Sequence, residues 1–296
     1  MVGMCRDLYA HCDTVKELFD VAEEKRPGIT ELCFSGPKES LDITINTQPA
    51  LFLADIACAT VLEEMGIKAD GVAGFSLGEV AGACYSGLMN YSQAFDFVCR
   101  RAEAMHECAE KNKGKMIAVL KLSRDHVERI CDSLEQVYPV NYNCPEQTVV
   151  ACMAQSAEKL QESVLKAGGK VIILATSGAF HSPFMDEASK SLFQYLKNEC
   201  HTQKLVFGKT RIPLYANSTA QPYSDPALEL AKQVNRPVLW QKTIENMVND
   251  GFNTFIEVGP GKTLSGLIRK INPLVGIYNV SDLESLANTV EVLGHA

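Results

Sequence analysis

Two long stretches of this 296-residue chain have the hydrophobic spacing of helices. Residues 48–66 are apolar on every side, with Pro49 near the first turn and a glycine at the end, which predicts a buried helix. Residues 90–111 predict a second helix, because Asn90 and Gln93 have the spacing of a capping box. Between them, the apolar run 71–73 predicts a short strand that leads into a helix from about residue 79.

The pattern changes between residues 115 and 176, where short apolar runs alternate with short amphipathic segments. The predicted order is strand, helix, strand, strand, helix, strand, at 116–120, 124–134, 137–141, 148–153, 157–167 and 170–174. This order over about 60 residues is typical of a ferredoxin-like unit. We therefore predict a small subdomain at 114–177, inserted into a larger one formed by 1–113 and 178–296.

The rest of the chain returns to longer alternating elements. We expect a helix at about 184–198, a strand at 255–258 and a late strand near 275–280. This alternation predicts an α/β fold with a mostly parallel sheet that is covered on both faces. The sequence Gly259-Pro260-Gly261-Lys262 lacks the spacing of a phosphate-binding loop, so we interpret it as a strand-to-helix turn.

Composition and charge exclude several classes of function. The chain is 46% hydrophobic and 22% charged, and its net charge of -8 argues against broad contact with nucleic acid or an anionic membrane. Eleven cysteines occur without a CxxC pair, which favours buried thiols in a reducing compartment over disulfides or a metal site. No signal peptide is recognisable, and the apolar helix around Asp55 is expected to be too short to span a bilayer. We predict a soluble cytoplasmic protein.

The pentapeptide Gly74-Phe75-Ser76-Leu77-Gly78 is the strongest chemical signal in the chain. A strand, a sharp turn and a helix are what a nucleophile elbow requires, because small flanking residues leave the serine hydroxyl exposed above a sheet. The turn also directs the amide of Leu77 and the helix N-terminus at an oxygen that becomes negative during acyl transfer. Ser76 is therefore a candidate nucleophile.

A serine nucleophile needs a base, and the chain contains six histidines. His181 follows a predicted strand and a Gly-Ala turn and precedes a predicted helix, which would place it at the mouth of a sheet. His295 alone fits the order Ser, acid, His of an α/β-hydrolase, but it lies in a two-residue tail. A single histidine is more often an ordinary polar residue than a catalyst, so it is the elbow that favours His181 as the base.

Arg101 lies along the apolar edge of its predicted helix, with no acidic residue three or four positions away. An arginine in such a place needs a distant partner, because burying it unpaired is costly. Two interpretations remain open: a tertiary ion pair within the fold, or a bidentate clamp for a substrate carboxylate.

Several motifs in a fixed order together resemble the malonyl-CoA:acyl-carrier-protein transacylase family, which includes the acyltransferases of polyketide synthases. Besides the elbow, they are Thr47-Gln48-Pro49-Ala50-Leu51, Arg101 with Met105, Asn141-Tyr142-Asn143-Cys144-Pro145, Ala179-Phe180-His181-Ser182, Asn235-Arg236-Pro237-Val238 and Glu257-Val258-Gly259-Pro260-Gly261-Lys262. The resemblance covers nearly the whole chain. It implies an α/β-hydrolase-like large subdomain with an inserted ferredoxin-like small one.

The resemblance also implies roles for single residues. Ser76 matches the nucleophile and His181 its base, which a main-chain carbonyl, here that of Gln233, orients in place of a triad acid. Arg101 matches the arginine that holds the malonyl carboxylate, and Gln48 matches a glutamine that lines the pocket.

Two further positions bear on the acyl group by the same resemblance. Met105 follows Arg101 as it does in the family and is expected to contribute to substrate binding. Phe180 resembles the malonyl-selective members, because a bulky ring there crowds a substituent at C2.

The implied activity is transfer of malonyl from malonyl-CoA to the phosphopantetheine thiol of an acyl carrier protein. It would proceed by a ping-pong mechanism through a malonyl-Ser76 ester and serve fatty-acid or polyketide synthesis. No metal or bound cofactor is required. We expect a free-standing monomer whose partners are malonyl-CoA and an acyl carrier protein, with no nucleic acid or membrane.

Two departures from the family pattern affect this expectation. Phe75 precedes the serine where malonyl-using members usually carry histidine, and it is expected to reshape the pocket. The segment that begins at Met1 resembles the part of the family that follows its Gly-Gln-Gly-x-Gln motif, so a first strand and a second oxyanion amide are expected to be missing. Losing one such donor typically lowers the rate about a hundred- to a thousandfold.

Two alternatives to malonyl transfer remain open. An acyl-carrier-protein hydrolase on the same fold would release acyl groups to water, although Arg101 would disfavour neutral acyl chains. A scaffold without catalysis is suggested by the departure at the N-terminus, whereas the presence of Ser76, His181 and Arg101 together argues for an enzyme.

Overall fold

The computed structural model describes residues 1–176 and 178–294, and the chain divides into two compact units. The first unit comprises Met1–Ala102, Leu205–Leu214 and Asp250–Ala296, and the second comprises Glu103–Lys204 and Tyr215–Asn249. The second unit is thus wider than the predicted small subdomain at 114–177, whose last residue lies outside the described part of the chain. That 114–177 is a subdomain of its own stays a prediction.

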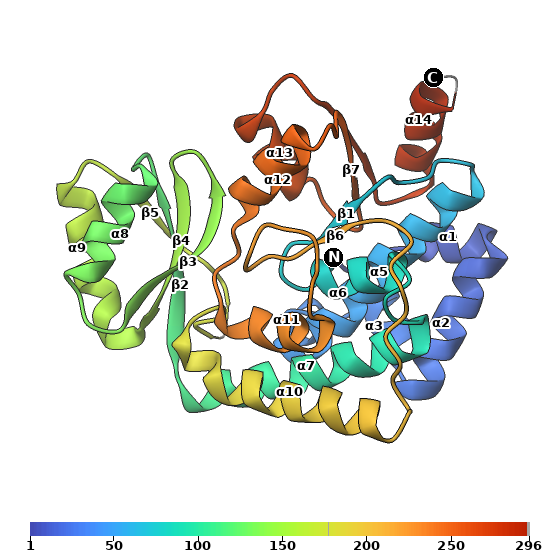
Figure 1. Cartoon of the computed structure of the whole chain (residues 1–296), viewed down its shortest axis with the longest axis horizontal. Helices are drawn as coiled ribbons and strands as arrows, with labels where there is room; N and C mark the ends of the chain where they lie inside the picture. The colour runs from blue at the N-terminus through green and yellow to red at the C-terminus, as the bar shows by residue number, and fades with distance from the viewer. Residues whose placement is uncertain (177, 295–296) are drawn as a thin grey trace. The chain divides into compact units, whose positions relative to one another are not determined.

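The first unit is mostly helical, with short strands (Figure 1). Its helices are α1 (Arg6–His11), α2 (Asp13–Lys25), α3 (Ile29–Ser35), α4 (Lys38–Leu41), α5 (Thr44–Glu64), α6 (Gly78–Tyr85), the beginning of α7 (Tyr91–Lys111), α13 (Thr263–Ile271) and α14 (Leu283–Leu293). Its strands are β1 (Val72–Ala73), the first residue of β6 (Leu214–Tyr215), β7 (Thr254–Val258) and β8 (Gly276–Val280).

Helix α5 is the central helix of the first unit and packs against α2, α3, α4, α6 and β7. It begins at Thr44, so Pro49 lies inside the helix and the predicted start at residue 48 was wrong. The added residues are polar except for Ile45, and the Thr47 hydroxyl contacts the main-chain oxygens of Leu41 and Ile43. A polar first turn of this kind cannot be recognised from hydrophobic spacing alone.

The length of α5 also corrects the expectation that it is too short to span a bilayer. By length and composition alone, this 21-residue helix could cross a membrane. However, 67% of its most apolar window is buried inside the structure, so its apolar surface is used in packing, as in a core helix.

Strands β7 and β8 pair in parallel, from Thr254 opposite Gly276 to Val258 opposite Val280. After β7, residues 259–262 form the expected turn into α13, where the Glu257 carboxylate accepts the amides of Leu264 at 2.9 Å and Ser265 at 2.7 Å. In the described residues, β7 and β8 form one two-stranded sheet, and β1 and β6 form another. The α/β class is confirmed.

The second unit contains an antiparallel sheet with the order β3-β4-β2-β5. Its elements are the end of α7, β2 (Gly114–Leu120), α8 (Arg124–Asp132), β3 (Val137–Cys144), β4 (Gln147–Met153), η1 (Ala154–Ser156), α9 (Ala157–Lys166), β5 (Lys170–Ile173), η2 (Pro183–Met185), α10 (Asp186–His201), α11 (Pro226–Lys232), η3 (Gln233–Asn235) and α12 (Trp240–Asn249). The predicted βαββαβ order is confirmed. The other elements differ from the prediction by one or two residues at an end, whereas β3 continues three residues further, to Cys144, and leaves a two-residue connection to β4.

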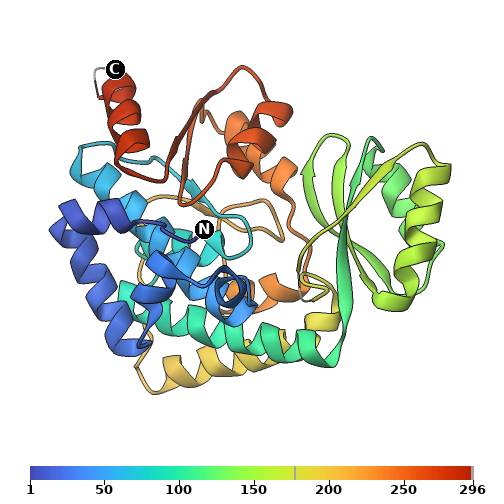
Figure 2. The same ribbon diagram turned by 180° about the vertical axis from the view of Figure 1, so that it is seen from behind.

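The sheet of the second unit has an apolar core on each face. Helices α8 and α9 cover one face, as Figures 1 and 2 show from both sides. The core there includes Ile117, Val150 and Leu160. On the other face Met116 and Ala151 pack with Ala179, which directly precedes the Phe180-His181 motif, so the sheet anchors the segment that carries the histidine.

Candidate active site

The turn between β1 and α6 holds Ser76 in a strained backbone conformation. Its φ angle is 52°, in the left-handed region that a residue other than glycine adopts only at some cost. Helix α6 begins two residues later, at Gly78. A serine on a tight strand-to-helix turn with this strain is the local geometry of a nucleophile elbow.

The two glycines of the pentapeptide serve different purposes. A Cβ atom on Gly74 would lie 1.8 Å from the carbonyl carbon of Gly78, so only glycine fits at this position. A Cβ atom on Gly78 would have no heavy atom within 4 Å. Space is therefore limiting at the first glycine of the turn and not at the second.

The main-chain hydrogen bonds of the turn distinguish the Leu77 amide from the amides that follow it. The amides of Gly78, Glu79 and Val80 donate to the main-chain oxygens of the residues three positions before them. The Leu77 amide donates to no carbonyl of this turn, as far as the structure describes it. This amide lies directly after Ser76, where an oxyanion donor is required.

Arg101 joins the elbow to α5 within the first unit. Its side chain is only 1% exposed, and its Nη2 atom donates to the Ser76 Oγ at 3.2 Å. Its Nη1 atom donates to the Oε1 atom of Gln48, whose side chain is also buried. Both of these acceptors are neutral oxygens, and the two hydrogen bonds orient the guanidinium group toward the elbow.

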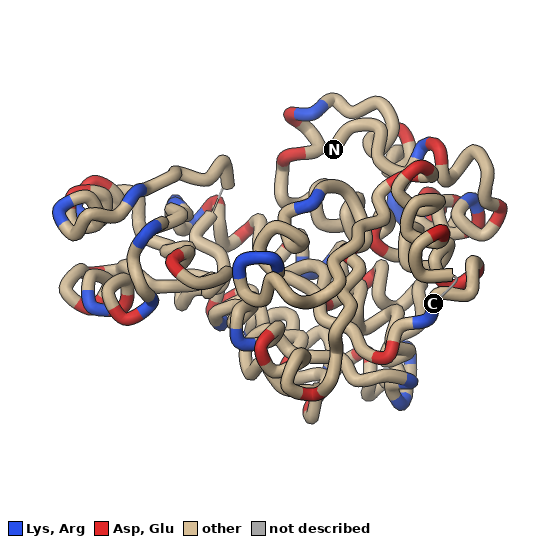
Figure 3. Tube along the Cα trace, turned by 90° about the horizontal axis from the view of Figure 1, so that it is seen from above, with Lys and Arg blue, Asp and Glu red and all other residues tan. Residues whose placement is uncertain are grey.

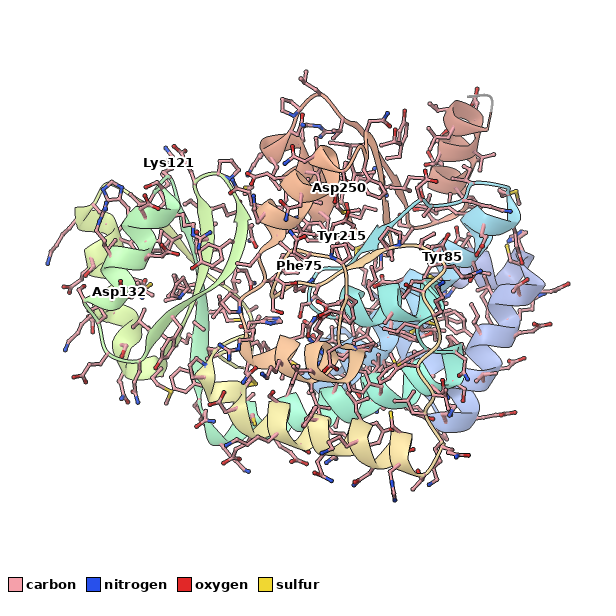
Figure 4. The ribbon with its side chains drawn as sticks, viewed as in Figure 1. Phe75, Tyr85, Lys121, Asp132, Tyr215 and Asp250 are labelled. Carbon is pink, nitrogen blue, oxygen red and sulfur yellow. The ribbon has the colours of Figure 1, made fainter. Side chains whose placement is uncertain are left out.

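Phe75 directly precedes the serine and is partly exposed. Figure 4 labels it where the chain enters α6, with Tyr85 at the far end of the same helix. Its effect on the acyl pocket stays a prediction.

His181 is held in the second unit by two consecutive main-chain oxygens of the short helix η3. Its Nδ1 atom lies 3.0 Å from the oxygen of Gln233, and its own amide donates to the oxygen of Val234 at 2.9 Å. The residue is 3% exposed and has a φ angle of 60°, so its backbone is strained like that of Ser76. The structure thus fixes both the ring and the main chain of His181.

The Gln233 contact determines the tautomer of the imidazole. A carbonyl oxygen can only accept, so Nδ1 must carry the proton and Nε2 must carry the lone pair when the ring is neutral. An imidazole in this state can accept a proton at Nε2, as a general base does.

Asn217 is a polar residue of this region that sequence reasoning missed. It is 1% exposed, and its Oδ1 atom accepts from the Gln233 Nε2 atom at a long 3.5 Å. Its main-chain oxygen also accepts the amide of Leu239. Nothing in the spacing of the sequence indicates that these distant residues meet.

Phe180 and Met105 lie in the second unit and are both packed. Phe180 is partly buried against the Met116 and Ala179 core, and Met105 is 2% exposed. Their predicted contacts with an acyl group stay predictions. The alternative base, His295, lies outside the described residues.

Comparison with known proteins places these features in a family. The family model described as an acyl transferase domain matches residues 2–273. The chain belongs to the acyl transferase domain family. Within the part of this acyl transferase domain that the structure describes, no group of three or more His, Cys, Asp and Glu residues is arranged to hold a metal ion.

The similar proteins carry a common name. A malonyl CoA-acyl carrier protein transacylase from Bacillus subtilis (strain 168) is 33% identical, over 99% of this acyl transferase domain and 93% of that protein. The crystal structure of the transacylase of that name from Clostridium perfringens has a TM-score of 0.92 and 33% identity, covering 100% of this chain and 94% of the other. A malonyl-transacylase in complex with its type II PKS acyl-carrier protein has a TM-score of 0.93 and 30% identity, covering 99% and 96%.

Proposed function

We propose that this protein transfers the malonyl group from malonyl-CoA to the phosphopantetheine thiol of an acyl carrier protein, through a malonyl ester of Ser76. The observation that carries the proposal is the hydrogen bond from the buried guanidinium group of Arg101 to the Ser76 hydroxyl. A cation beside a nucleophile suits an acyl group that ends in a carboxylate. The names of the similar proteins support the same activity.

The first half of the reaction forms the acyl-enzyme. The His181 Nε2 atom accepts the proton of the Ser76 hydroxyl as its oxygen attacks the thioester carbonyl carbon of malonyl-CoA. The Leu77 amide stabilises the oxyanion of the tetrahedral intermediate. The carbon-sulfur bond then breaks, and the CoA thiolate takes the proton from His181, leaving malonyl on Ser76.

The second half repeats these steps with a different thiol. His181 takes the proton of the phosphopantetheine thiol, and its sulfur attacks the malonyl-Ser76 ester. The ester bond breaks, and the Ser76 oxygen regains its proton from His181. Because CoA leaves before the carrier protein reacts, the kinetics are ping-pong.

Arg101 selects the acyl group. Two parallel hydrogen bonds from a guanidinium group match the geometry of a carboxylate, and neutral acyl chains offer no such partner. The same feature disfavours an acyl-carrier-protein hydrolase for neutral chains. Serine ester chemistry with these residues needs no metal or cofactor.

The finer expectations are part of the proposal. We place the protein in the cytoplasm as a monomer that serves fatty-acid or polyketide synthesis and binds no nucleic acid. Lys and Arg are interspersed with Asp and Glu along the trace (Figure 3), and the net charge is -8. Broad contact with a polyanion is disfavoured by this charge pattern.

A transfer assay tests the proposal. The protein is mixed with malonyl-CoA and a carrier protein bearing phosphopantetheine, and the mass of the carrier protein is followed over time. We expect a malonyl-carrier product with wild type. The rate of malonyl transfer should be about a hundredfold lower in Arg101→Met, since hydrogen bonds to charged groups contribute about 1.5–3 kcal/mol each. Release of free malonate at the rate of CoA release, without a carrier product, would favour a hydrolase instead.

A further inference from the structure

His181 lies in a tight turn that the side chain of the next residue, Ser182, closes. Phe180 and His181 are the two central residues of this turn, and His181 has a φ angle of 60°. A turn with a positive φ at its second central residue usually has glycine or asparagine there. Since a histidine occupies this position, other contacts must hold its backbone in the strained conformation.

The Ser182 hydroxyl supplies such a contact across the turn. It donates to the main-chain oxygen of Ala179 at 2.6 Å and accepts the amide of Phe184 at 3.3 Å, at the start of η2. Ser182 is 1% exposed and Ala179 is 0% exposed, so the bond between them is shielded from water. One side chain therefore joins the residue before the Phe180-His181 pair to the chain after it.

Both ends of this bridge are anchored in the second unit. Ala179 packs with Met116 and Ala151 on the antiparallel sheet. The main-chain oxygen of Ser182 accepts the amide of Met185, the last residue of η2, at 2.9 Å. The bridge therefore fixes the turn to the sheet on one side and to η2 on the other.

We propose that Ser182 is a positioning residue, whose hydroxyl holds the turn so that Nδ1 of His181 stays against the main-chain oxygen of Gln233. The proposal deepens the malonyl transfer proposed above and rests on it. Without the hydroxyl, the buried Ala179 oxygen loses a donor and the strained backbone of His181 can relax. The imidazole would then leave the Gln233 oxygen, which keeps the proton on Nδ1 and the lone pair on Nε2.

The test compares wild type with Ser182→Ala, which removes only the hydroxyl group. Ser86→Ala is the matched control, because the buried Ser86 hydroxyl also donates to a main-chain oxygen three residues before it, that of Ala83 at 3.3 Å. Ser86 follows the last residue of α6, at the opposite end of that helix from the elbow. Single-turnover rates of malonyl ester formation are measured by intact mass over a range of malonyl-CoA concentrations, and thermal melting reports folding.

We expect Ser182→Ala to lower the maximal rate constant of ester formation by about ten- to a hundredfold, since a displacement of about 1 Å in an active site has the larger effect. The malonyl-CoA concentration that gives half of this rate should stay within about twofold of wild type, because Ser182 acts on the base and not on substrate binding. Ser86→Ala should melt at a lower temperature and keep its rate constant within about twofold. A loss of stability alone would lower the amount of ester formed and not the rate constant.

The nitrogen signals of the imidazole give a readout that does not depend on the reaction. Protein with isotope-labelled histidine is measured by NMR at a pH of about 8, where an ordinary histidine is neutral. The signals of His181 are those that are absent from His181→Ala. We expect wild type to carry the proton on Nδ1 and Ser182→Ala to show a mixture of both tautomers.

The outcomes separate the two proposals. If wild type forms no malonyl ester, the proposed function fails, and this inference fails with it. If wild type reacts but Ser182→Ala keeps the wild-type rate constant, or keeps the proton on Nδ1 alone, the inference alone is overturned. If Ser182→Ala does not fold, Ser182→Cys decides, because it fills a similar space with a weaker donor. A rate constant lower by about threefold or more, with the same change of tautomer, would then support the bridge, and a wild-type rate constant would overturn it.

Discussion

The Nδ1 atom of His181 lies 3.0 Å from the main-chain oxygen of Gln233, an acceptor that no side-chain substitution removes. The amide of His181 is bonded to the oxygen of the next residue, Val234. The imidazole is therefore held by the backbone of η3, and no carboxylate is needed to fix its tautomer.

This relationship makes a prediction that distinguishes a backbone from a side-chain role. His181→Ala should slow acyl-enzyme formation by about a hundred- to ten-thousandfold, because it removes the general base. Gln233→Ala keeps the main-chain oxygen, so its rate of acyl-enzyme formation should stay within about tenfold of wild type. Any decrease would come from losing the side-chain contact with Asn217. Quenched single-turnover rates with malonyl-CoA measure both, and equal losses in the two variants would show that the Gln233 side chain is what matters.

The elbow makes a prediction about its two glycines. Gly74→Ala places a methyl group against the backbone of Gly78, so the turn must shift and the unfolding free energy should fall by more than about 2 kcal/mol. Gly78→Ala meets open space at the first position of α6, and its stability should match or exceed that of wild type.

Urea denaturation measures the stability of the Gly74→Ala and Gly78→Ala variants, and the rate of malonyl ester formation measures their activity. The Gly74→Ala variant should also lose about a hundredfold in rate, since a displacement of about 1 Å at a nucleophile has that effect. An active Gly74→Ala variant of normal stability would contradict the described turn.

Phe180 leads to a prediction about substituted malonyl groups. Phe180→Ala should raise the rate with methylmalonyl-CoA relative to malonyl-CoA, because it removes the ring that is expected to crowd C2. Phe180 is partly buried against the Met116 core, so we also expect a loss of stability of about 2–4 kcal/mol. Competition between the two CoA esters, scored by the mass of the acyl-enzyme, measures the preference. An unchanged ratio of methylmalonyl to malonyl adduct would show that the Phe180 ring does not contact the acyl group.

Asp55 makes a prediction about stability and pH. Loss of water around its carboxyl group raises its pKa well above the usual range, and the nearby Glu257 carboxylate raises it further. An acid with a raised pKa in the folded state binds its proton more tightly when folded, so stability falls as pH rises from the unfolded pKa toward the folded pKa. At neutral pH Asp55→Asn should therefore be more stable than wild type.

Melting temperatures across pH test this expectation. The gain of Asp55→Asn should shrink toward zero as pH falls to about 4, where unfolded Asp also begins to bind its proton. Asp20→Asn, on the exposed side of α2, controls for the loss of one surface charge. A gain in melting temperature of the same size at pH 4 and pH 7 would show that the raised pKa of Asp55 does not cause it.

The sequence predicted the order of elements better than their ends. The βαββαβ order follows from local apolar runs bounded by turn residues, and the Asn90–Gln93 capping box is present with bonds of 3.3 and 2.9 Å in the two directions. The start of α5 was missed because residues 44–47 stabilise the helix through polar contacts, which leave no periodic signal.

The candidate site was predictable only in part, for a related reason. Ser76 stands in a local motif that strand, turn and helix signals surround, so its strained turn could be expected from neighbouring residues. The Arg101 contact with Gln48 joins residues 53 positions apart, and the Gln233 contact with Asn217 joins the short helix η3 to the turn after β6. Such pairs depend on tertiary packing, and only the family resemblance indicated some of them in advance.

The most direct test of the central claim is the intact mass of the protein after brief exposure to malonyl-CoA, beside a Ser76→Ala variant and a version extended upstream of Met1. We predict one malonyl adduct on the protein with Ser76 and none on Ser76→Ala. Absence of an adduct from both the present chain and the extended version, or an equal adduct on Ser76→Ala, would contradict transfer through a malonyl-Ser76 ester.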